Sequence, residues 1–146
     1  MLNGVRIVEL EGIGPAPFAG MLLADMGADV IVVQRPGKNP TPGMPDQPIL
    51  NRGKRCMTLD LKSDRDREVL LKLVGTADAL IEGFRPGVME RLGIGPEECG
   101  RLNPKLVFGR MTGWGQDGPM SHLAGHDMNY IGMSGALWHA SLPGQP

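Results

Sequence analysis

The stretch that decides the fold is VRIVELEGIGPAPFAGMLLADMGADVIVVQ, residues 5–34. Residues 5–10 nearly alternate apolar with polar side chains and are rich in β-branched residues, which predicts a strand. Residues 15–26 predict an amphipathic helix, with Pro15 at its first position, Gly27 at its C-cap and an apolar stripe of Phe18, Met21, Leu22 and Met26. Residues 29–34 contain the continuous apolar run of a strand buried on both faces. Together they predict a parallel, right-handed strand–helix–strand unit.

The same alternation continues along the chain. Further strands are predicted over residues 55–61, 77–82 and 105–110, and further helices over residues 63–74, 86–92, 96–102 and 126–137. Ser63 is expected to cap the first of these helices, whose apolar stripe is Val69, Leu70, Leu73 and Val74. Strands that alternate with helices predict an α/β fold with a Rossmann-like, doubly wound and mostly parallel sheet.

Two segments show no such periodicity. Residues 35–53 contain five prolines and three glycines and predict a long irregular loop. Residues 138–146 look loop-like and stop without a closing element. We therefore expect residues 1–146 to form a single but incomplete N-terminal domain, truncated at its C-terminus.

The composition excludes several classes of function. The chain has 15 Lys plus Arg against 16 Asp plus Glu, a formal net charge of -1, which argues against nucleic-acid or membrane-surface binding. It lacks both a run of about 18 apolar residues and a signal peptide, so a soluble, cytoplasmic protein is expected. Cys56 and Cys99 lack the spacing of metal ligands, which predicts no metal and two buried or half-buried thiols.

The turn after the first strand only partly matches a dinucleotide-binding pattern. Gly12 and Gly14 begin the glycine fingerprint, but Pro17 occupies its third position, so the Rossmann signature fails. Arg35 stands where a carboxylate would bind an unphosphorylated ribose, and an arginine there suits a ribose phosphate. NADP and coenzyme A (CoA) both carry one, and the broken fingerprint favours CoA. The alternative is that Arg35 is a surface residue beside a proline.

Further cations are expected near the same edge of the sheet, where a polyanionic ligand would account for them. They are Arg52, Lys54, Arg55, Lys62, Arg85 and Arg91. The alternative is a solvated face of mixed charge.

The segment AGHDMNY, residues 124–130, is the one place where acid–base chemistry is expected. His126 would fall in the first turn of the predicted helix, where the exposed N–H groups and the helix dipole favour a neutral imidazole that can act as a base. Asp127 suits the same dipole. The alternative is that His126 is an ordinary helix-start residue and Asp127 a capping charge.

Several ordered blocks resemble the N-terminal part of the family III CoA-transferases, and within that family the racemase branch that acts on 2-methylacyl-CoA in fatty acid metabolism. These blocks are VRIVEL, GIGPAP, LLADMGADVIVVQRPG, NRGKRCMTLDLKS, ADALIEGFRPGVMERLGIGPEE, NPKLVFGRMTGWGQDGP and AGHDMNYIGMSGAL. The resemblance covers residues 5–137 and implies an intertwined homodimer of longer chains with a Rossmann-like domain.

The resemblance also implies a set of site residues. Ile13 and Arg35 would contact the CoA nucleotide. The adenosine and phosphate site would be lined by Leu59, Asp60, Leu61, Lys62, Gly83, Phe84, Arg85 and Arg91. His126 would be a catalytic base beside the thioester, flanked by Gly125, Asp127, Met128, Asn129 and Tyr130. No cofactor is implied beyond the CoA moiety of the substrate.

His126 separates the two branches of the family, because the transferases typically have an aromatic residue at this position. The racemase reading is epimerisation of 2-methylacyl-CoA thioesters through an enolate, with a second base, an aspartate assisted by a glutamate, beyond Pro146. The chain alone is then expected to be inactive, and its acyl-chain specificity is not indicated. A CoA-transferase that carries histidine here, or an inactive CoA-binding fragment, are the alternatives.

Overall fold

The computed structural model describes residues 1–37, 48–140 and 144. The chain forms two compact units, Met1–Met111 and Thr112–Pro146, each described by itself below. No helix within these described residues is long and apolar enough to cross a membrane.

The first unit is built on one five-stranded sheet, in which every pair of neighbouring strands is parallel. The strands are β1 (Arg6–Leu10), β2 (Asp29–Gln34), β3 (Arg55–Thr58), β4 (Ala79–Glu82) and β5 (Val107–Arg110). Their order is β3-β2-β1-β4-β5, with Val8 of β1 between Ile31 and Leu80. The chain moves outward from β1 in one direction and resumes on its other side with β4, so the topological switch point lies between β1 and β4.

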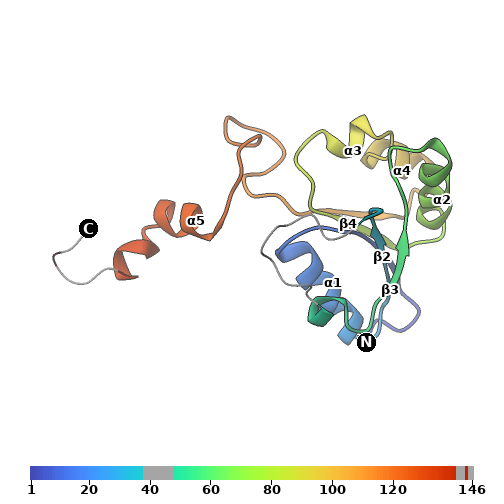
Figure 1. Cartoon of the computed structure of the whole chain (residues 1–146), viewed down its shortest axis with the longest axis horizontal. Coiled ribbons are helices and arrows are strands. Elements are labelled where there is room, and N and C mark those ends of the chain that lie inside the picture. Colours follow the sequence, from blue (N-terminus) through green and yellow to red (C-terminus); the bar gives the residue numbers. More distant parts are fainter. Residues whose placement is uncertain (38–47, 141–143, 145–146) are drawn as a thin grey trace. The chain divides into compact units, whose positions relative to one another are not determined.

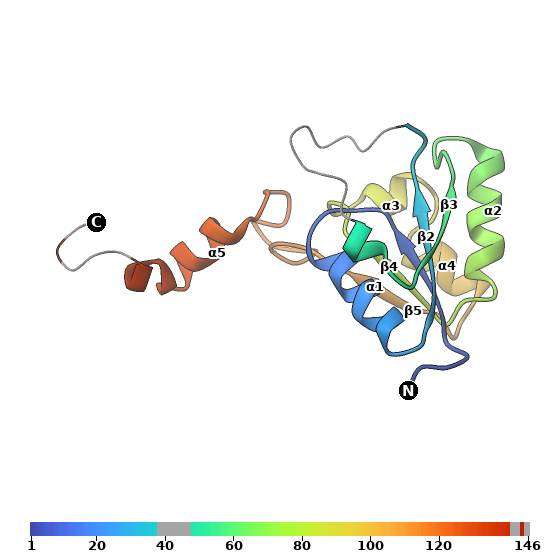
Figure 2. The ribbon, with the colours of Figure 1, turned by 60° about the horizontal axis from the view of Figure 1, so that its bottom comes forward.

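Helices cover both faces of this sheet, which confirms the α/β fold (Figures 1 and 2). On one side lie α1 (Pro15–Asp25) and the short 3₁₀ helix η1 (Pro48–Asn51). On the other lie α2 (Asp64–Val74), α3 (Val88–Arg91) and α4 (Pro96–Leu102). The larger core cluster includes Val8, Leu10, Leu80, Leu70 and Met89, and the smaller one is centred on Ile7, Ala28 and Val30.

The apolar stripe predicted for α1 is correct for Met21 and wrong for its other three residues. The helix buries Ala16, Pro17, Gly20 and Met21. Phe18, Leu22 and Met26 are 50%, 39% and 46% exposed. The reason lies under Gly20, where an added Cβ would overlap the Glu9 carboxylate and lie 2.9 Å from its Cδ and 3.1 Å from Lys54 Nζ. Small residues face the sheet because α1 approaches it closely over a buried ion pair.

That ion pair joins three parts of the first unit. Lys54 Nζ donates to Glu9 Oε2 at 2.7 Å and to the carbonyl oxygen of Pro17 at 2.9 Å. The two side chains are 0% and 1% exposed. Burial raises the pKa of Glu9, while the hydrogen bond and the charge of Lys54 oppose that rise. The segment before β3 is thereby fastened to β1 and to the first turn of α1.

Three local predictions are corrected. Residues 48–51 form η1 within the predicted loop, and residues 38–47 of that loop lie outside the described residues. Ser63 is the N-cap residue of α2, but its side chain makes no capping hydrogen bond. Cys99 is buried as expected, whereas Cys56 is exposed because it lies on β3, an edge strand.

The second unit contains α5 (Asp127–Met133) and the 3₁₀ helix η2 (Ala136–Ala140). The predicted helix over 126–137 is therefore shorter, and part of the predicted C-terminal loop is helical. The break falls at Gly135, whose φ of 79° suits glycine and does not continue an α-helix. Residues 141–143 and 145–146 lie outside the described residues.

Candidate functional site

The predicted site residues of the first unit follow the carboxyl ends of four adjacent strands. Ile13 follows β1, Arg35 follows β2, residues 59–62 follow β3 and residues 83–85 follow β4. Since all strands are parallel, these segments lie along one edge of the sheet and include both sides of the switch point. This is the edge at which open α/β sheets bind ligands.

Ile13 and Arg35 are both exposed at this edge. Ile13 is 62% exposed, and the side chain of Arg35 is 59% exposed. The backbone N–H of Arg35 donates to Glu11 Oε2 at 3.2 Å, and its Nε lies 3.7 Å from the same oxygen. Arg35 can reach an anion, but Glu11 partly compensates its charge.

The segment after β3 is held by hydrogen bonds from its backbone N–H groups to aspartate side chains. The Leu59 side chain lies in the core, so only the backbone of this residue can meet a ligand. The N–H of Asp60 donates to Asp66 Oδ2 at 2.8 Å, and Asp60 Oδ1 accepts from the N–H of Lys62 at 3.0 Å. Leu61 is half-buried against the core. Lys62 is exposed and has no ion pair among the described residues.

The segment after β4 places a cation beside the switch point. Gly83 is close to α1, since an added Cβ would lie 3.4 Å from the Ala16 methyl group. Phe84 is half-buried against the core, while Arg85 is exposed. Arg91 at the end of α3 is also exposed. Neither arginine forms an ion pair within the part of the chain that the structure describes.

Three cations predicted for this edge form ion pairs in other parts of the first unit. Lys54 is buried against Glu9, and Arg52 pairs with Asp25 at the end of α1. Arg55 begins β3 and pairs with Asp29 at the start of β2, with Nη2 2.6 Å from Oδ2. Strand starts lie at the opposite, amino edge of a parallel sheet, so Arg55 lies away from the predicted site. Lys54 is excluded by its burial, and Arg52 by its ion pair at the end of α1.

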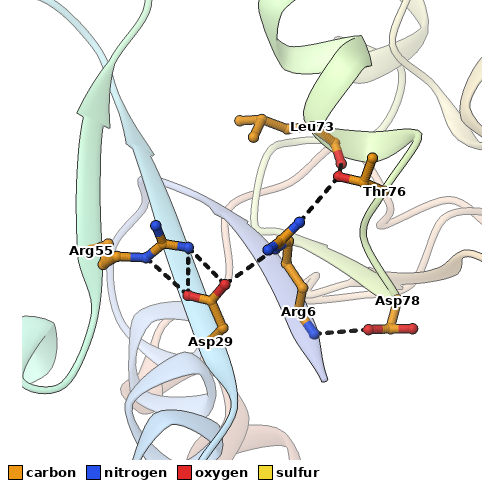
Figure 3. Close-up of polar contacts among 6 residues, drawn as sticks. All are labelled: Arg6, Asp29, Arg55, Leu73, Thr76 and Asp78. Atoms are coloured by element: carbon orange, nitrogen blue, oxygen red, sulfur yellow. Dashed lines mark hydrogen bonds and ion pairs between the residues drawn. The ribbon is translucent and has the colours of Figure 1, made fainter. Parts of the chain in front are cut away.

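The amino-edge cluster is charge-balanced (Figure 3). Arg6 donates from Nε to Asp29 Oδ2 at 3.1 Å and from its backbone N–H to Asp78 at 2.8 Å. The hydrogen bonds from Arg55 hold the pKa of Asp29 below its usual range. These contacts join the starts of β1, β2 and β3, so the cluster is explained as structural.

In the second unit His126 is the N-cap residue of α5, one position before the predicted first turn. Its N–H donates to Asn129 Oδ1 at 2.9 Å. Its carbonyl oxygen accepts from the N–H groups of Asn129 and Tyr130. His126, Asp127, Met128 and Asn129 are exposed. The backbone of the predicted base is thus fixed on both sides while its imidazole faces solvent.

An aromatic pair supports the residues before His126. The rings of Trp114 and Tyr130 lie 5.0 Å apart, and Trp114 Nε1 donates to the carbonyl oxygen of Ala124 at 3.2 Å. A Cβ added at Gly125 would lie 2.7 Å from Tyr130 Cζ, so a side chain cannot fit there. Tyr130 therefore packs directly on the residue before His126, which gives Gly125 a steric role.

Sequence reasoning missed Trp114, Glu82 and Arg110 as supporting residues. No local sequence pattern indicated that Trp114 would donate a hydrogen bond to the carbonyl oxygen of Ala124. Glu82 and Arg110 end neighbouring strands at the carboxyl edge, and this position was a usable signal. Groups of three or more His, Cys, Asp or Glu side chains that suit a metal ion are absent from residues 1–37 and 48–140.

The amino-acid sequence of this chain is similar to those of known proteins. The family model for CoA-transferase family III matches residues 2–146. Alpha-methylacyl-CoA racemase of Mus musculus is 48% identical over 137 residues, 94% of this chain and 34% of the racemase. Acetyl-CoA:oxalate CoA-transferase of Acetobacter aceti is 36% identical over 99% of this chain and 39% of its own.

A solved structure has a similar fold. Rv3272 of Mycobacterium tuberculosis superimposes with a TM-score of 0.86 at 34% identity, covering 99% of this chain and 42% of that one. The chain thus spans between about a third and two fifths of the length of these relatives. The fold and the match along nearly the whole chain show that this chain belongs to CoA-transferase family III.

Proposed function

We propose that this chain is the CoA-binding part of an enzyme that epimerises 2-methylacyl-CoA thioesters, with His126 as one of two bases. The observation that carries the proposal is the exposed imidazole of His126 on a backbone fixed by Asn129 and Tyr130. The higher identity to a racemase than to the oxalate transferase supports the same branch.

The carboxyl edge supports the proposal of CoA binding. Lys62, Arg85 and Arg91 are exposed there without ion pairs among the described residues, and Arg35 is exposed beside Glu11. Guanidinium groups bind phosphate in a bidentate way, and an ammonium group adds a point charge. Four such cations suit the phosphate groups of CoA, and the exposed Ile13 offers an apolar contact to its base.

In the proposed reaction the neutral His126 imidazole removes the proton α to the thioester carbonyl. The C–H electron pair moves into the bond to the carbonyl carbon, and the oxygen takes the negative charge of an enolate. A second acid returns a proton to the opposite face, because inversion needs acid–base groups on both sides of the carbon. His126 is left protonated and its partner deprotonated, and exchange with solvent restores both groups.

Asp127 is a weak choice for that second group. It follows His126 directly and lies in the first turn of α5, where an acidic side chain interacts favourably with the helix dipole. We therefore propose that the second base is not one of the described residues, and that the 146-residue chain alone does not epimerise its substrate.

We also propose that the protein is a homodimer. Phe18, Leu22 and Met26 recur every four residues on the exposed side of α1, and each is at least 39% exposed. An apolar row of this kind is typical of a surface that a partner covers.

The second candidate function is transfer of CoA between carboxylic acids, favoured by the match to acetyl-CoA:oxalate CoA-transferase along 99% of the chain. One experiment separates the two. The full gene product that contains this chain is incubated with a single epimer of a 2-methylacyl-CoA, with and without an added free carboxylic acid. Racemase activity gives the second epimer in both samples. Formation of a new acyl-CoA only with the added acid, and no second epimer, would identify a transferase.

A further inference from the structure

A charge cluster that contains the buried Glu82 lies at the carboxyl ends of β4 and β5. Glu82 is 1% exposed, and its Oε1 accepts from Arg110 Nε at 2.9 Å. The same guanidinium donates from Nη2 to Glu90 Oε1 at 2.7 Å. Arg110 thus joins a strand end to α3 through two of its nitrogens, a forked geometry that lysine cannot reproduce.

Each carboxylate of the cluster lies close along the chain to one of the exposed arginines. Glu82 Oε2 accepts from the N–H of Phe84 at 2.7 Å, which fixes the turn that carries Arg85. Glu90 is the chain neighbour of Arg91 in α3. The hydrogen bond from its own backbone N–H lowers the pKa of Glu90, burial opposes this, and Arg110 and Arg91 lower it further.

The two exposed arginines belong to one compact turn. The N–H of Val88 donates to the carbonyl oxygen of Arg85 at 3.1 Å. A Cβ added at Gly87 would lie 3.1 Å from Arg91 Nη1, so the Arg91 side chain folds back over this turn. Their separation is therefore set by how the turn and α3 are held, and Arg110 holds both.

We propose that Arg110, with Glu82 and Glu90, is a positioning residue for phosphate binding by Arg85 and Arg91. The proposal rests on the proposed CoA-binding function. Arg110 holds the Glu90 carboxylate in an ion pair, so Glu90 does not form one with Arg91, and Arg110 holds the turn so that both arginines meet the ligand already ordered. Preordered side chains bind more tightly because less conformational freedom is lost on binding.

The test uses substitutions that keep the charge and change only the geometry. Arg110→Lys loses the fork, and Glu90→Asp shortens the link to α3. Arg101→Lys and Glu97→Asp make the same chemical changes in the exposed ion pair of α4, where Arg101 Nη2 lies 3.1 Å from Glu97 Oε1. CoA binding to the chain is measured by titration calorimetry, and circular dichroism checks that each variant is folded.

Arg110→Lys and Glu90→Asp are expected to weaken CoA binding roughly tenfold and fivefold, whereas the α4 variants leave it unchanged within about twofold. In an Arg85→Ala/Arg91→Ala background the same two changes are expected to have less than about a twofold effect, because nothing remains to be positioned. If Arg110→Lys does not fold, the comparison of Glu90→Asp in the two backgrounds tests the positioning role alone.

Equal effects in both backgrounds would overturn the positioning role while leaving CoA binding intact. Failure of the unsubstituted chain to bind CoA would overturn the proposed function and this inference together.

Discussion

Replacing Lys54 by Met tests whether the buried ion pair under α1 holds the first unit together. The substitution keeps a chain of similar length but removes the ammonium group that lies 2.7 Å from Glu9 Oε2. Glu9 would remain in a site where it is 1% exposed, with no cation in contact. The helix α1 packs directly on its carboxylate through Gly20.

The size of the effect follows from this geometry. Removing one partner of a buried ion pair typically costs about 3–5 kcal/mol, because the remaining charge is uncompensated. A domain of this size has a total stability of about 5–15 kcal/mol, so roughly a fifth or more of it would be lost. Lys105→Met is the matched control, because Lys105 is exposed and is expected to change stability by less than about 0.5 kcal/mol.

The cost should depend on pH in a definite direction. Burial raises the pKa of Glu9 in the folded protein, so this group stabilises the fold below its unfolded pKa and that contribution is lost as the pH rises through the folded pKa. Without Lys54 nothing opposes the rise, and the pKa of Glu9 moves higher still. Lys54→Met is therefore expected to be more damaging at pH 8 than at pH 5, where the folded variant takes up a proton on Glu9.

Urea unfolding followed by circular dichroism at both pH values measures these differences, and Glu9→Gln/Lys54→Met serves as the charge-free reference. That double variant should recover part of the loss at pH 8. A cost below about 1 kcal/mol at pH 8, or one that does not shrink at pH 5, would refute the account of this ion pair.

Other predictions follow from single contacts. Gly20→Ala should lower the free energy of unfolding by more than about 2 kcal/mol, because the added Cβ overlaps Glu9. Gly100→Ala is the control, because an added Cβ there has nothing within 4 Å, and it should be neutral or stabilise the fold by up to about 1 kcal/mol. Equal effects of the two substitutions would contradict the close packing of α1. A thiol reagent should label one cysteine in the native chain, the exposed Cys56, because burial raises the pKa of Cys99 to about 11; rapid labelling of both would show that α4 is not packed as described. Trp114→Phe keeps an aromatic ring beside Tyr130 but loses the hydrogen bond to the carbonyl oxygen of Ala124. Loss of a hydrogen bond of about 1 kcal/mol should slow epimerisation by the full gene product about fivefold. An unchanged rate would exclude a role of Trp114 in placing His126.

The fold was largely predictable because runs of apolar residues mark its strands locally in the sequence. The apolar run at residues 30–33 is typical of a strand covered on both faces, and Pro15 marks the start of α1. The stripe of α1 was not predictable, because it depends on Lys54, 45 residues after Glu9, reaching under the helix. Local periodicity cannot report a contact that the tertiary fold creates.

Position at the carboxyl edge was predictable where a residue follows a strand, as Arg35 and Arg85 do. The prediction was wrong for Arg55, which begins a strand, and the end of a strand at which a residue lies decides its edge of the sheet. Lys54 and Arg52 were misplaced for another reason, since their partners Glu9 and Asp25 are distant in sequence. The assignment of His126 as a base came from its predicted position at a helix start and was strengthened by the family resemblance. The structure adds that its backbone is fixed and its side chain exposed.

The most direct test of the central proposal is deuterium uptake at the carbon α to the thioester. The full gene product, its His126→Ala variant and a His122→Ala variant are incubated with one epimer of a 2-methylacyl-CoA in deuterated water. His122 is an exposed histidine of the same unit and is the control. The account predicts uptake with epimerisation in the unsubstituted and His122→Ala proteins, and loss of epimerisation by a factor of about 100 or more in His126→Ala. Full epimerisation by His126→Ala, or no uptake in any of the three proteins while CoA passes to an added carboxylate, would contradict it.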